Sequence, residues 1–306
     1  MYDLIIVGGG PAAVGAGVYA ARKQLNTLII TDNFEGQSTV SPEIYNWIGT
    51  PSISGNNLSK SLENHLREYE GEYMTIKTKA LVTTVEGADG SFSVTTNDEE
   101  NYTTKTILIA SGAKRRKLTI PGAEEYDQKG LTYCASCDGP LFSDMDVAVI
   151  GGGNAGFESA SQLLAYVKSV TLLDINNEFN ADPVTVERVL KNQNIGALTN
   201  AETLEILGDK MVTGLRYKDL KTGEEHTLSV SGIFVEIGSV PNTSMTSGLV
   251  EQNNMGHIKV DPRTQKTSEL GIWAAGDCTD GLYAQNNIAV GDAIKALEDI
   301  YLHLKA

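Results

Sequence analysis

The chain has 306 residues, of which 41% are hydrophobic and 21% charged, and its formal net charge at pH 7 is −15. This length can bury the cores of two domains, and no apolar run approaches the ~20 residues that a membrane span needs. The negative charge argues against nucleic acid as a partner, because binding to a phosphate backbone depends on clustered Lys and Arg. We therefore expect a soluble globular protein with no nucleic-acid and no membrane partner.

The first residues, from Met1 onward, lead directly into an apolar strand. Because no secretory leader comes before that strand, we expect neither a signal peptide nor a preceding domain, and we expect a cytoplasmic protein. Three cysteines in 306 residues are too few for a disulfide framework. Of these, Cys278 stands alone in the sequence, and we interpret it as a small buried residue.

The sequence contains an internal duplication. Each copy has an apolar strand, a glycine-rich turn, a helix and a second strand that ends near an acidic residue. In the first copy these are the strand 4–7, the turn 8–13, a helix to about Lys23, the strand 27–30 and Asp32; in the second they are the strand 147–150, the turn 151–156, a helix to about Tyr166, the strand 170–173 and Asp174. Further strands are expected at 81–85, 92–96 and 106–111 in the first copy and at 204–206, 212–217 and 233–237 in the second.

Each glycine-rich turn predicts a dinucleotide site. A turn of this kind between a strand and a helix sets backbone N–H groups and the helix N-terminus against a pyrophosphate. The turn residues are Gly8, Gly10, Pro11 and Ala12 in the first copy and Gly151, Gly153, Asn154 and Gly156 in the second. We therefore expect two nucleotides, one for each copy.

A last apolar strand at 271–275 and a closing helix at about 287–304 follow the second copy without belonging to it. We assign them to the first domain, which then comprises residues 1–115 and 245–306, with a second domain, residues 116–244, inserted. The predicted fold class is α/β: two Rossmann-like nucleotide-binding domains of three-layer ββα architecture, the second inserted into the first.

Asp174 lies 23 residues after Gly151, where a carboxylate can accept hydrogen bonds from both ribose hydroxyls of an adenosine. A 2′-phosphate would be repelled there, and residues 175–178 offer no Arg or Lys to neutralise it. The second site is therefore predicted to take NADH rather than NADPH. The alternative is that Asp174 is only a solvated strand end.

Two cysteines, Cys134 and Cys137, are separated by two residues. Thiols at this spacing can close a small, reducible disulfide. Zinc would need a second pair of ligands, and the four histidines show no ligand spacing, so no metal site is expected. Asp138 follows directly and could carry a proton to or from a thiolate, or could cap the turn before Gly139.

With these features the chain resembles the low-molecular-weight thioredoxin reductases, and within that family the reductase core of alkyl hydroperoxide reductase flavoproteins. The likeness extends over essentially the whole chain. It is carried by the segments 8–12, 35–37, 110–114, 134–140, 151–156, 234–238, 241–242 and 274–278.

The resemblance implies FAD in the first domain and a nicotinamide cofactor in the second. It implies that Cys137 is the thiol nearer the flavin, that Cys134 attacks the disulfide of the partner, and that Asp138 is the acid/base. The cofactor-binding residues implied in the first domain, besides its glycine turn, are Asp32, Gln37, Asn46, Ser111, Gly112, Gly276, Asp277 and Gln285. It also implies a homodimer and, since no thioredoxin-like module precedes the flavin domain, a separate thioredoxin-, glutaredoxin-like or peroxiredoxin-system protein as acceptor.

The sequence departs from the family pattern at several positions. The acid that would bind the FAD ribose falls at Thr31 or Asp32, of which we assign Asp32. Glu35 stands where a glycine is usual, and Ala284 replaces a basic residue, which changes the charge expected near the flavin.

Two other functions remain as alternatives. One is a disulfide reductase that takes electrons from ferredoxin or another flavoprotein and has no working nicotinamide site; the intact turn at Gly151 and the acid at Asp174 argue against it. The other is a non-catalytic FAD-binding redox sensor, against which the intact Cys134, Cys137 and Asp138 argue.

Overall fold

The computed structural model describes residues 1–41 and 44–305. The chain forms two compact units. The first comprises Met1–Val40, Trp47–Lys114 and Val240–Ala306, and the second comprises Ser41–Asn46 and Arg115–Ser239. Besides the short segment Ser41–Asn46, the chain passes between the units after residue 114 and before residue 240. The domain bounds 1–115, 116–244 and 245–306 stay a prediction.

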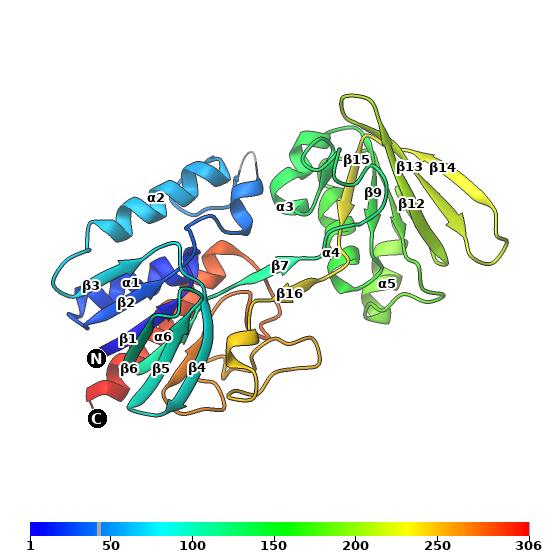
Figure 1. Cartoon of the computed structure of the whole chain (residues 1–306). Helices are drawn as coiled ribbons and strands as arrows, with labels where there is room; N and C mark the ends of the chain where they lie inside the picture. Colours follow the sequence, from blue (N-terminus) through cyan, green and yellow to red (C-terminus); the bar gives the residue numbers. More distant parts are fainter. Residues whose placement is uncertain (42–43, 306) are drawn as a thin grey trace. The chain divides into compact units, whose positions relative to one another are not determined.

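The first unit is built on a seven-stranded sheet with the order β3-β2-β1-β6-β5-β4, in which β17 also pairs with β6 (Figure 1). The strands β3, β2, β1, β6 and β17 are parallel, and β5 and β4 continue the sheet antiparallel. The elements are β1 (Tyr2–Val7), α1 (Pro11–Arg22), β2 (Thr27–Ile30), the 3₁₀ turn η1 (Gln37–Val40), α2 (Gly55–Arg67), β3 (Met74–Lys77), β4 (Val82–Ala88), β5 (Ser91–Thr96), β6 (Asn101–Ile109), η3 (Ser244–Thr246), β17 (Ile272–Ala274) and α6 (Asn286–Lys305).

Alternation along β1 explains how this sheet is covered on both faces. Leu4 and Ile6 pack into one core cluster with small residues of α1 and α6. Ile5 and Val7 point the other way, into a second cluster that includes Phe92 of β5. Successive side chains of a strand point to opposite faces, so a continuous apolar run indicates a strand that is buried on both sides.

The second unit has a five-stranded parallel sheet with the order β11-β10-β9-β15-β8. It also has a three-stranded antiparallel sheet, β12-β13-β14 (Figure 1). The elements are β8 (Leu131–Thr132), α3 (Ala135–Asp138), η2 (Gly139–Phe142), β9 (Asp146–Ile150), α4 (Asn154–Leu163), β10 (Ser169–Leu173), α5 (Pro183–Leu190), β11 (Ile195–Leu198), β12 (Ala201–Gly208), β13 (Val212–Asp219), β14 (Glu225–Ser229) and β15 (Gly232–Val235). Val147 and Val149 of β9 face one core cluster, and Ala148 and Ile150 face the other. The predicted α/β class with parallel sheets is therefore confirmed.

Several elements differ from the sequence expectations. Helix α4 ends at Leu163 rather than near Tyr166, because the chain tightens there into turns in which the N–H groups of Ala165 and Tyr166 bond to carbonyls three residues back. Helices α2 and α5 were not predicted. Both begin at a side-chain cap, Ser54 for α2 and Asp182 for α5.

Two of the segments at which the chain passes between the units are β7 (Ala113–Arg115) and β16 (Ser239–Pro241). They pair with each other as a two-stranded sheet (Figure 1). Within the described ranges 1–41 and 44–305, we find no helix that is both long and apolar enough to cross a bilayer.

Candidate active site

The first glycine turn joins β1 to α1 and leaves the start of that helix open. Gly8 has a φ of +130°, and a Cβ there would lie 2.2 Å from the carbonyl oxygen of Ala110, so only glycine fits. Gly10 has an ordinary φ of −78°, no side chain caps α1, and a Cβ added at Gly10 would meet no atom within 4 Å. Pro11 takes the first helical position, where its missing N–H is no loss.

The second glycine turn, between β9 and α4, repeats this geometry. Gly151 has a φ of +119°, and a Cβ there would lie 2.2 Å from the carbonyl oxygen of Glu236. Gly153 precedes α4 and has an ordinary φ of −85°. No side chain caps this helix, and a Cβ added at Gly153 would meet no atom within 4 Å. Gly156 packs the helix against the turn, since a Cβ would lie 1.8 Å from the Gly151 oxygen. Asn154 Oδ1 accepts a hydrogen bond of 2.8 Å from the backbone N–H of Asp182.

Both turns fit the pyrophosphate of a dinucleotide. Each offers an uncapped helix N-terminus, whose N–H groups and positive dipole end favour an anion. Each also keeps open the space that a side chain at Gly10 or Gly153 would fill. The residues present are thus compatible with FAD at the first turn and a nicotinamide dinucleotide at the second.

Asp174 lies at the end of β10 and is 6% exposed. Its Oδ2 accepts a hydrogen bond from the backbone N–H of Gly152, and its Oδ1 accepts bonds from the backbone and side-chain nitrogens of Asn176 at 2.7 and 2.8 Å. Asp174 is therefore fixed against the glycine turn rather than solvated.

The first turn has Thr31 at the equivalent place. A Cβ added at Gly9 would lie 2.5 Å from Thr31 Oγ1, as one at Gly152 would lie 2.5 Å from Asp174 Oδ2. Asp32 is the next residue; it is exposed, and its Oδ2 accepts a 2.9 Å hydrogen bond from Asn33. The assignment of a ribose contact to Asp32 therefore stays a prediction.

Four of the other residues predicted to bind the first cofactor gather at one edge of the first sheet. The strands β1, β6 and β17 are parallel neighbours, so their carboxyl ends bring together the glycine turn, Ser111 with Gly112, and Gly276 with Asp277. A Cβ at Gly276 would lie 3.5 Å from that of Ala12. In open α/β sheets, ligands bind at this edge.

Ser111 Oγ donates a 2.5 Å hydrogen bond to the carbonyl oxygen of Asn242, and Asn242 Nδ2 donates one of 2.9 Å to the carbonyl oxygen of Ser111. Gln37 Nε2 donates a 2.8 Å bond to the carbonyl oxygen of Ala113. Gln285 is an exposed residue directly before α6. Asn46 falls in the short segment Ser41–Asn46, which groups with the second unit, so the structure does not bring it into the first unit with the others.

Cys134 and Cys137 form a disulfide with a Cα–Cα distance of 5.3 Å. Cys134 precedes the single turn of α3, and the backbone N–H of Asp138 donates a 3.0 Å hydrogen bond to its carbonyl oxygen. The helical turn thus holds both sulfurs close together. Within the described part of the chain, no three His, Cys, Asp or Glu side chains cluster as metal ligands would.

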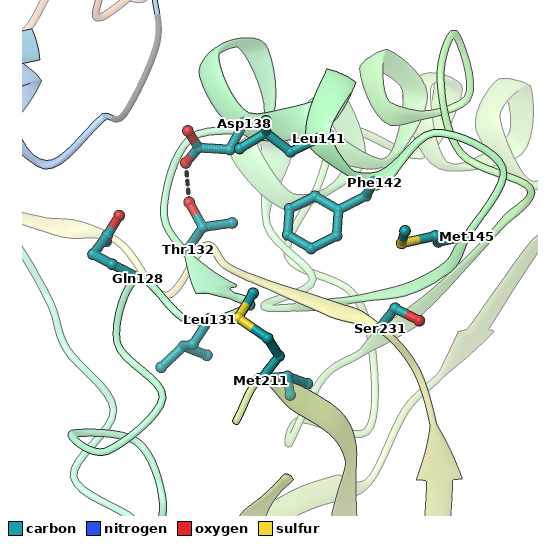
Figure 2. A pocket seen from close by; sticks show the side chains of 11 residues that line it. Gln128, Leu131, Thr132, Asp138, Leu141, Phe142, Met145, Met211 and Ser231 are labelled. Atoms are coloured by element: carbon teal, nitrogen blue, oxygen red, sulfur yellow. Dashed lines mark hydrogen bonds between the residues drawn. The ribbon is translucent and has the colours of Figure 1, made fainter. Parts of the chain in front are cut away.

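Asp138 is buried beside this disulfide, with 4% of its surface exposed. The hydroxyl of Thr132 donates a hydrogen bond to its Oδ2 (Figure 2), and its Oδ1 is buried without a partner among the described residues. Burial raises the pKa of the carboxyl group, while the bond from Thr132 and the positive charge of Arg115 lower it; burial is the largest of these effects. A carboxyl group with a raised pKa can hold a proton nearer to neutral pH.

Arg115 reaches the same region from β7. Its Nη1 donates a hydrogen bond to the carbonyl oxygen of Tyr133 and lies 3.6 Å from Glu236 Oε2. Glu236 Oε1 accepts a 2.7 Å bond from Ser159 of α4, and burial raises the pKa of this carboxyl group although Arg115 and Ser159 act against it. The guanidinium of Arg115 thus contacts Tyr133, the residue before Cys134. It also contacts Glu236, which follows β15 and lies beside the second glycine turn.

Sequence reasoning missed Thr132, Arg115 and Glu236. Thr132 lies two residues before the redox pair, which is a weak signal by itself. Arg115 and Glu236 are far apart in the sequence and meet only in the fold, so no local pattern could have joined them.

The comparisons with known proteins agree with this geometry. The profile of the pyridine nucleotide-disulphide oxidoreductase family matches residues 2–293. A Staphylococcus aureus (strain NCTC 8325 / PS 47) protein that is named as a component of alkyl hydroperoxide reductase is 43% identical over 295 residues, which are 96% of this chain and 57% of that protein. A Bacillus subtilis (strain 168) protein named NADH dehydrogenase is 41% identical over 295 residues, again 96% of this chain and 57% of that protein.

Among solved structures, thioredoxin reductase from Giardia duodenalis matches with a TM-score of 0.92 at 30% identity, covering 100% of this chain and 99% of that one. This match confirms the two Rossmann-like domains and the predicted resemblance to thioredoxin reductases. The chain spans little more than half the length of the two curated relatives named above. With a family profile that matches nearly its whole length and relatives above 40% identity, the chain belongs to the pyridine nucleotide-disulphide oxidoreductases.

Proposed function

We propose that this protein is an FAD-dependent disulfide reductase that receives hydride from NADH and passes electrons through Cys134 and Cys137 to another dithiol protein. The observation that carries the proposal is the disulfide beside a buried carboxyl group, in the same unit as an open glycine turn. The family of the chain supports FAD and a pyridine nucleotide as cofactors.

Bound FAD would supply the two-electron chemistry that links hydride transfer to disulfide reduction. The residues Gly8, Gly10, Pro11, Ala12, Ser111, Gly112, Gly276 and Asp277 would hold it at the edge of the first sheet, and Gly151, Gly153, Asn154, Gly156 and Asp174 would hold the nicotinamide dinucleotide. Cys137 is assigned as the sulfur nearer the flavin and Cys134 as the one that attacks the acceptor. Asp138 would hold the proton that a departing thiolate needs.

The acceptor disulfide lies outside these 306 residues. The third cysteine, Cys278, is fully buried, and burial raises the pKa of its thiol to about 11. A thiol of this kind is not reactive at neutral pH. We assign a thioredoxin-, glutaredoxin-like or peroxiredoxin-system protein as the acceptor, and the names of the relatives support this class of acceptor. A cytoplasmic location and a homodimer complete the proposal.

The choice of nicotinamide depends on the charge of Asp174. We expect the FAD-loaded protein, mixed without oxygen, to lose its flavin absorbance rapidly with NADH and slowly with NADPH. Asp174→Asn keeps the size of the side chain and removes the charge, so the ratio of kcat/KM between NADH and NADPH should fall by about tenfold. Glu178→Gln, an exposed charge in the following loop, is the matched control and should leave the ratio unchanged.

Failure of both nicotinamides to reduce the flavin would overturn the proposal and favour the ferredoxin-dependent alternative. The open turn at Gly153 and the fixed carboxylate of Asp174 do not favour that alternative. An unchanged preference for NADH in Asp174→Asn would contradict the assignment of nicotinamide selectivity to the charge of Asp174.

Asp138→Asn should lower turnover with a dithiol acceptor by about 10²-fold, the usual contribution of a general acid.

The Asp138→Asn change should also raise the free energy of unfolding at pH 8. Since burial raises the pKa of this carboxyl group above the ordinary value of 3.8, its ionisation costs the folded state stability as pH rises through the folded pKa. Thermal unfolding of both proteins should therefore coincide at pH 3 and separate at pH 8; equal melting temperatures at both values would contradict the raised pKa.

A further inference from the structure

The guanidinium of Arg115 acts on both flanks of the redox pair. Its Nη1 donates a hydrogen bond to the carbonyl oxygen of Tyr133, the residue before Cys134. Burial raises the pKa of Asp138, the residue after Cys137, and the positive charge of Arg115 acts against burial there. Because consecutive Cα atoms are only about 3.8 Å apart, a charge bound at Tyr133 lies next to Cys134. Arg115 is therefore a cation beside the segment that carries the disulfide.

Glu236 is the counter-charge of this guanidinium. Its Oε2 lies 3.6 Å from Arg115 Nη1, and its Oε1 accepts a 2.7 Å hydrogen bond from Ser159 of α4. The side chain of Glu236 is 12% exposed and that of Arg115 is 35% exposed. Burial raises the pKa of Glu236, and Arg115 and Ser159 oppose this by stabilising the carboxylate. Charges that are partly buried are screened less by salt than charges on the surface.

Reduction of the disulfide creates negative charge close to Arg115. Two electrons and one proton break the S–S bond and leave one thiolate and one thiol. Under the proposed function the electrons come from NADH through FAD and the proton comes from Asp138, which is left as a carboxylate. A neighbouring cation favours a thiolate over a thiol, whereas a disulfide carries no charge. The charge of Arg115 therefore favours the reduced state of the pair over the oxidised state.

We propose that Arg115 is a positioning residue whose charge stabilises the reduced form of Cys134 and Cys137, and that Glu236 opposes this effect as its counter-charge. The inference rests on the proposed function, since it takes the two cysteines as the groups that store the electron pair. Arg115 belongs to β7 and Glu236 follows β15. Two residues from the two ends of the second unit thus set the equilibrium between disulfide and dithiol.

The test measures this equilibrium directly and needs neither NADH nor a protein acceptor. The FAD-loaded protein is equilibrated without oxygen in mixtures of reduced and oxidised dithiothreitol at pH 8. Its thiols are then alkylated and counted by mass spectrometry, and Cys278, which forms no disulfide, adds the same count throughout. The fraction of reduced pair in each mixture gives the equilibrium constant for reduction.

Four variants separate charge from structure. Arg115→Gln removes the charge and keeps an N–H donor for the carbonyl oxygen of Tyr133, whereas Arg115→Lys keeps the charge. Glu236→Gln removes the counter-charge and keeps an acceptor for Ser159. Arg216→Met is the matched control, since Arg216 of β13 also pairs with two glutamates, Glu205 and Glu225, in the same unit.

We expect Arg115→Gln to lower the equilibrium constant for reduction by about tenfold, which corresponds to about 30 mV for a two-electron couple. Arg115→Lys should stay close to the wild type. Glu236→Gln should raise the constant by about threefold, because the guanidinium then acts without its counter-charge. Arg216→Met should leave the constant unchanged. Loss of packing alone would not shift the Arg115 and Glu236 variants in opposite directions.

A wild-type constant in Arg115→Gln would overturn the role of Arg115. A constant that falls or stays the same in Glu236→Gln would overturn the role of Glu236. Circular dichroism and retained flavin absorbance show that each variant is folded. If Arg115→Gln does not fold, Arg115→Met removes the same charge, and a wild-type constant in that variant overturns the proposal equally.

Failure of this inference is distinguishable from failure of the proposed function. If NADH does not reduce the flavin but the constants shift in opposite directions as expected, the inference about charge stands and the assigned activity falls. If NADH reduces the flavin and all variants share the wild-type constant, the activity stands and the inference falls.

Discussion

Replacing either Cys134 or Cys137 by serine is expected to lower the rate of reduction of a dithiol acceptor by about 10³-fold or more and to leave the purified variants yellow. Either change removes one of the two sulfurs that must open and close together, so no disulfide can store the electron pair. Flavin binding should persist, because the cysteines belong to the second unit and the first glycine turn to the first. Steady-state reduction of a thioredoxin-type protein measures turnover, and the flavin absorption spectrum of each purified variant measures FAD binding.

The matched control for this experiment is Cys278→Ser. Cys278 is fully buried in the first unit, where its Sγ lies 3.4 Å from the carbonyl oxygens of Ile109 and Ala275. A serine hydroxyl can take the same contacts, so turnover should stay close to that of the wild type. Robust turnover by either variant of the redox pair, or inactivity of Cys278→Ser, would refute the roles assigned to the three cysteines.

Valine at Gly10 or at Gly153 is expected to remove one cofactor and spare the other. Both glycines have φ values that valine can adopt and open space around the Cβ position, so the chain should still fold. The added side chain would occupy the place proposed for a pyrophosphate. Gly10→Val should purify colourless, whereas Gly153→Val should purify yellow and resist reduction by NADH.

We expect each affinity to fall by about 100-fold or more, which corresponds to about 2.7 kcal/mol of lost binding free energy. Gly196→Val is the control: it lies in β11, where an added Cβ also meets no atom within 4 Å, and it should keep both cofactors. Titration of the apoprotein with FAD and anaerobic titration of the holoprotein with NADH give the two affinities. A yellow Gly10→Val variant, or a Gly153→Val variant that NADH reduces normally, would contradict the assignment of these turns.

The duplicated strand, turn and helix could be predicted from the sequence because their signals are local. A buried strand is a short apolar run, and the first glycine of each turn is required by its close contact with the backbone of a neighbouring strand end. Gly8 and Gly151 have positive φ values and face a carbonyl oxygen at the same distance. Sequence reasoning finds such features because few residues other than glycine fit.

Helix α2 shows a signal that was present and not used. Leu58, Leu62 and Leu66 recur at the i, i+4, i+8 spacing of one helix face, and Ser54 caps the start. Polar residues fill the positions between these leucines, so the average composition of the segment is that of a loop. The helix is indicated by the spacing of the leucines and not by the composition.

The surroundings of Asp138 could not be predicted. Its raised pKa results from burial by residues that are separate in the sequence, and its partners Thr132 and Arg115 approach from two different strands. The position of Asp138 next to Cys137 predicted a role for it, whereas its unpartnered Oδ1 is a property of the fold alone.

The near-identity of the two glycine turns has a consequence for ligand discrimination. FAD and NADH share an adenosine diphosphate half, and under the proposed function both turns bind the diphosphate of that half. Neither turn can then discriminate between FAD and NADH. The first difference between the sites comes at the ends of β2 and β10, where Thr31 is neutral and Asp174 carries a carboxylate, so sorting of the two coenzymes has to begin there and continue toward the flavin and nicotinamide rings.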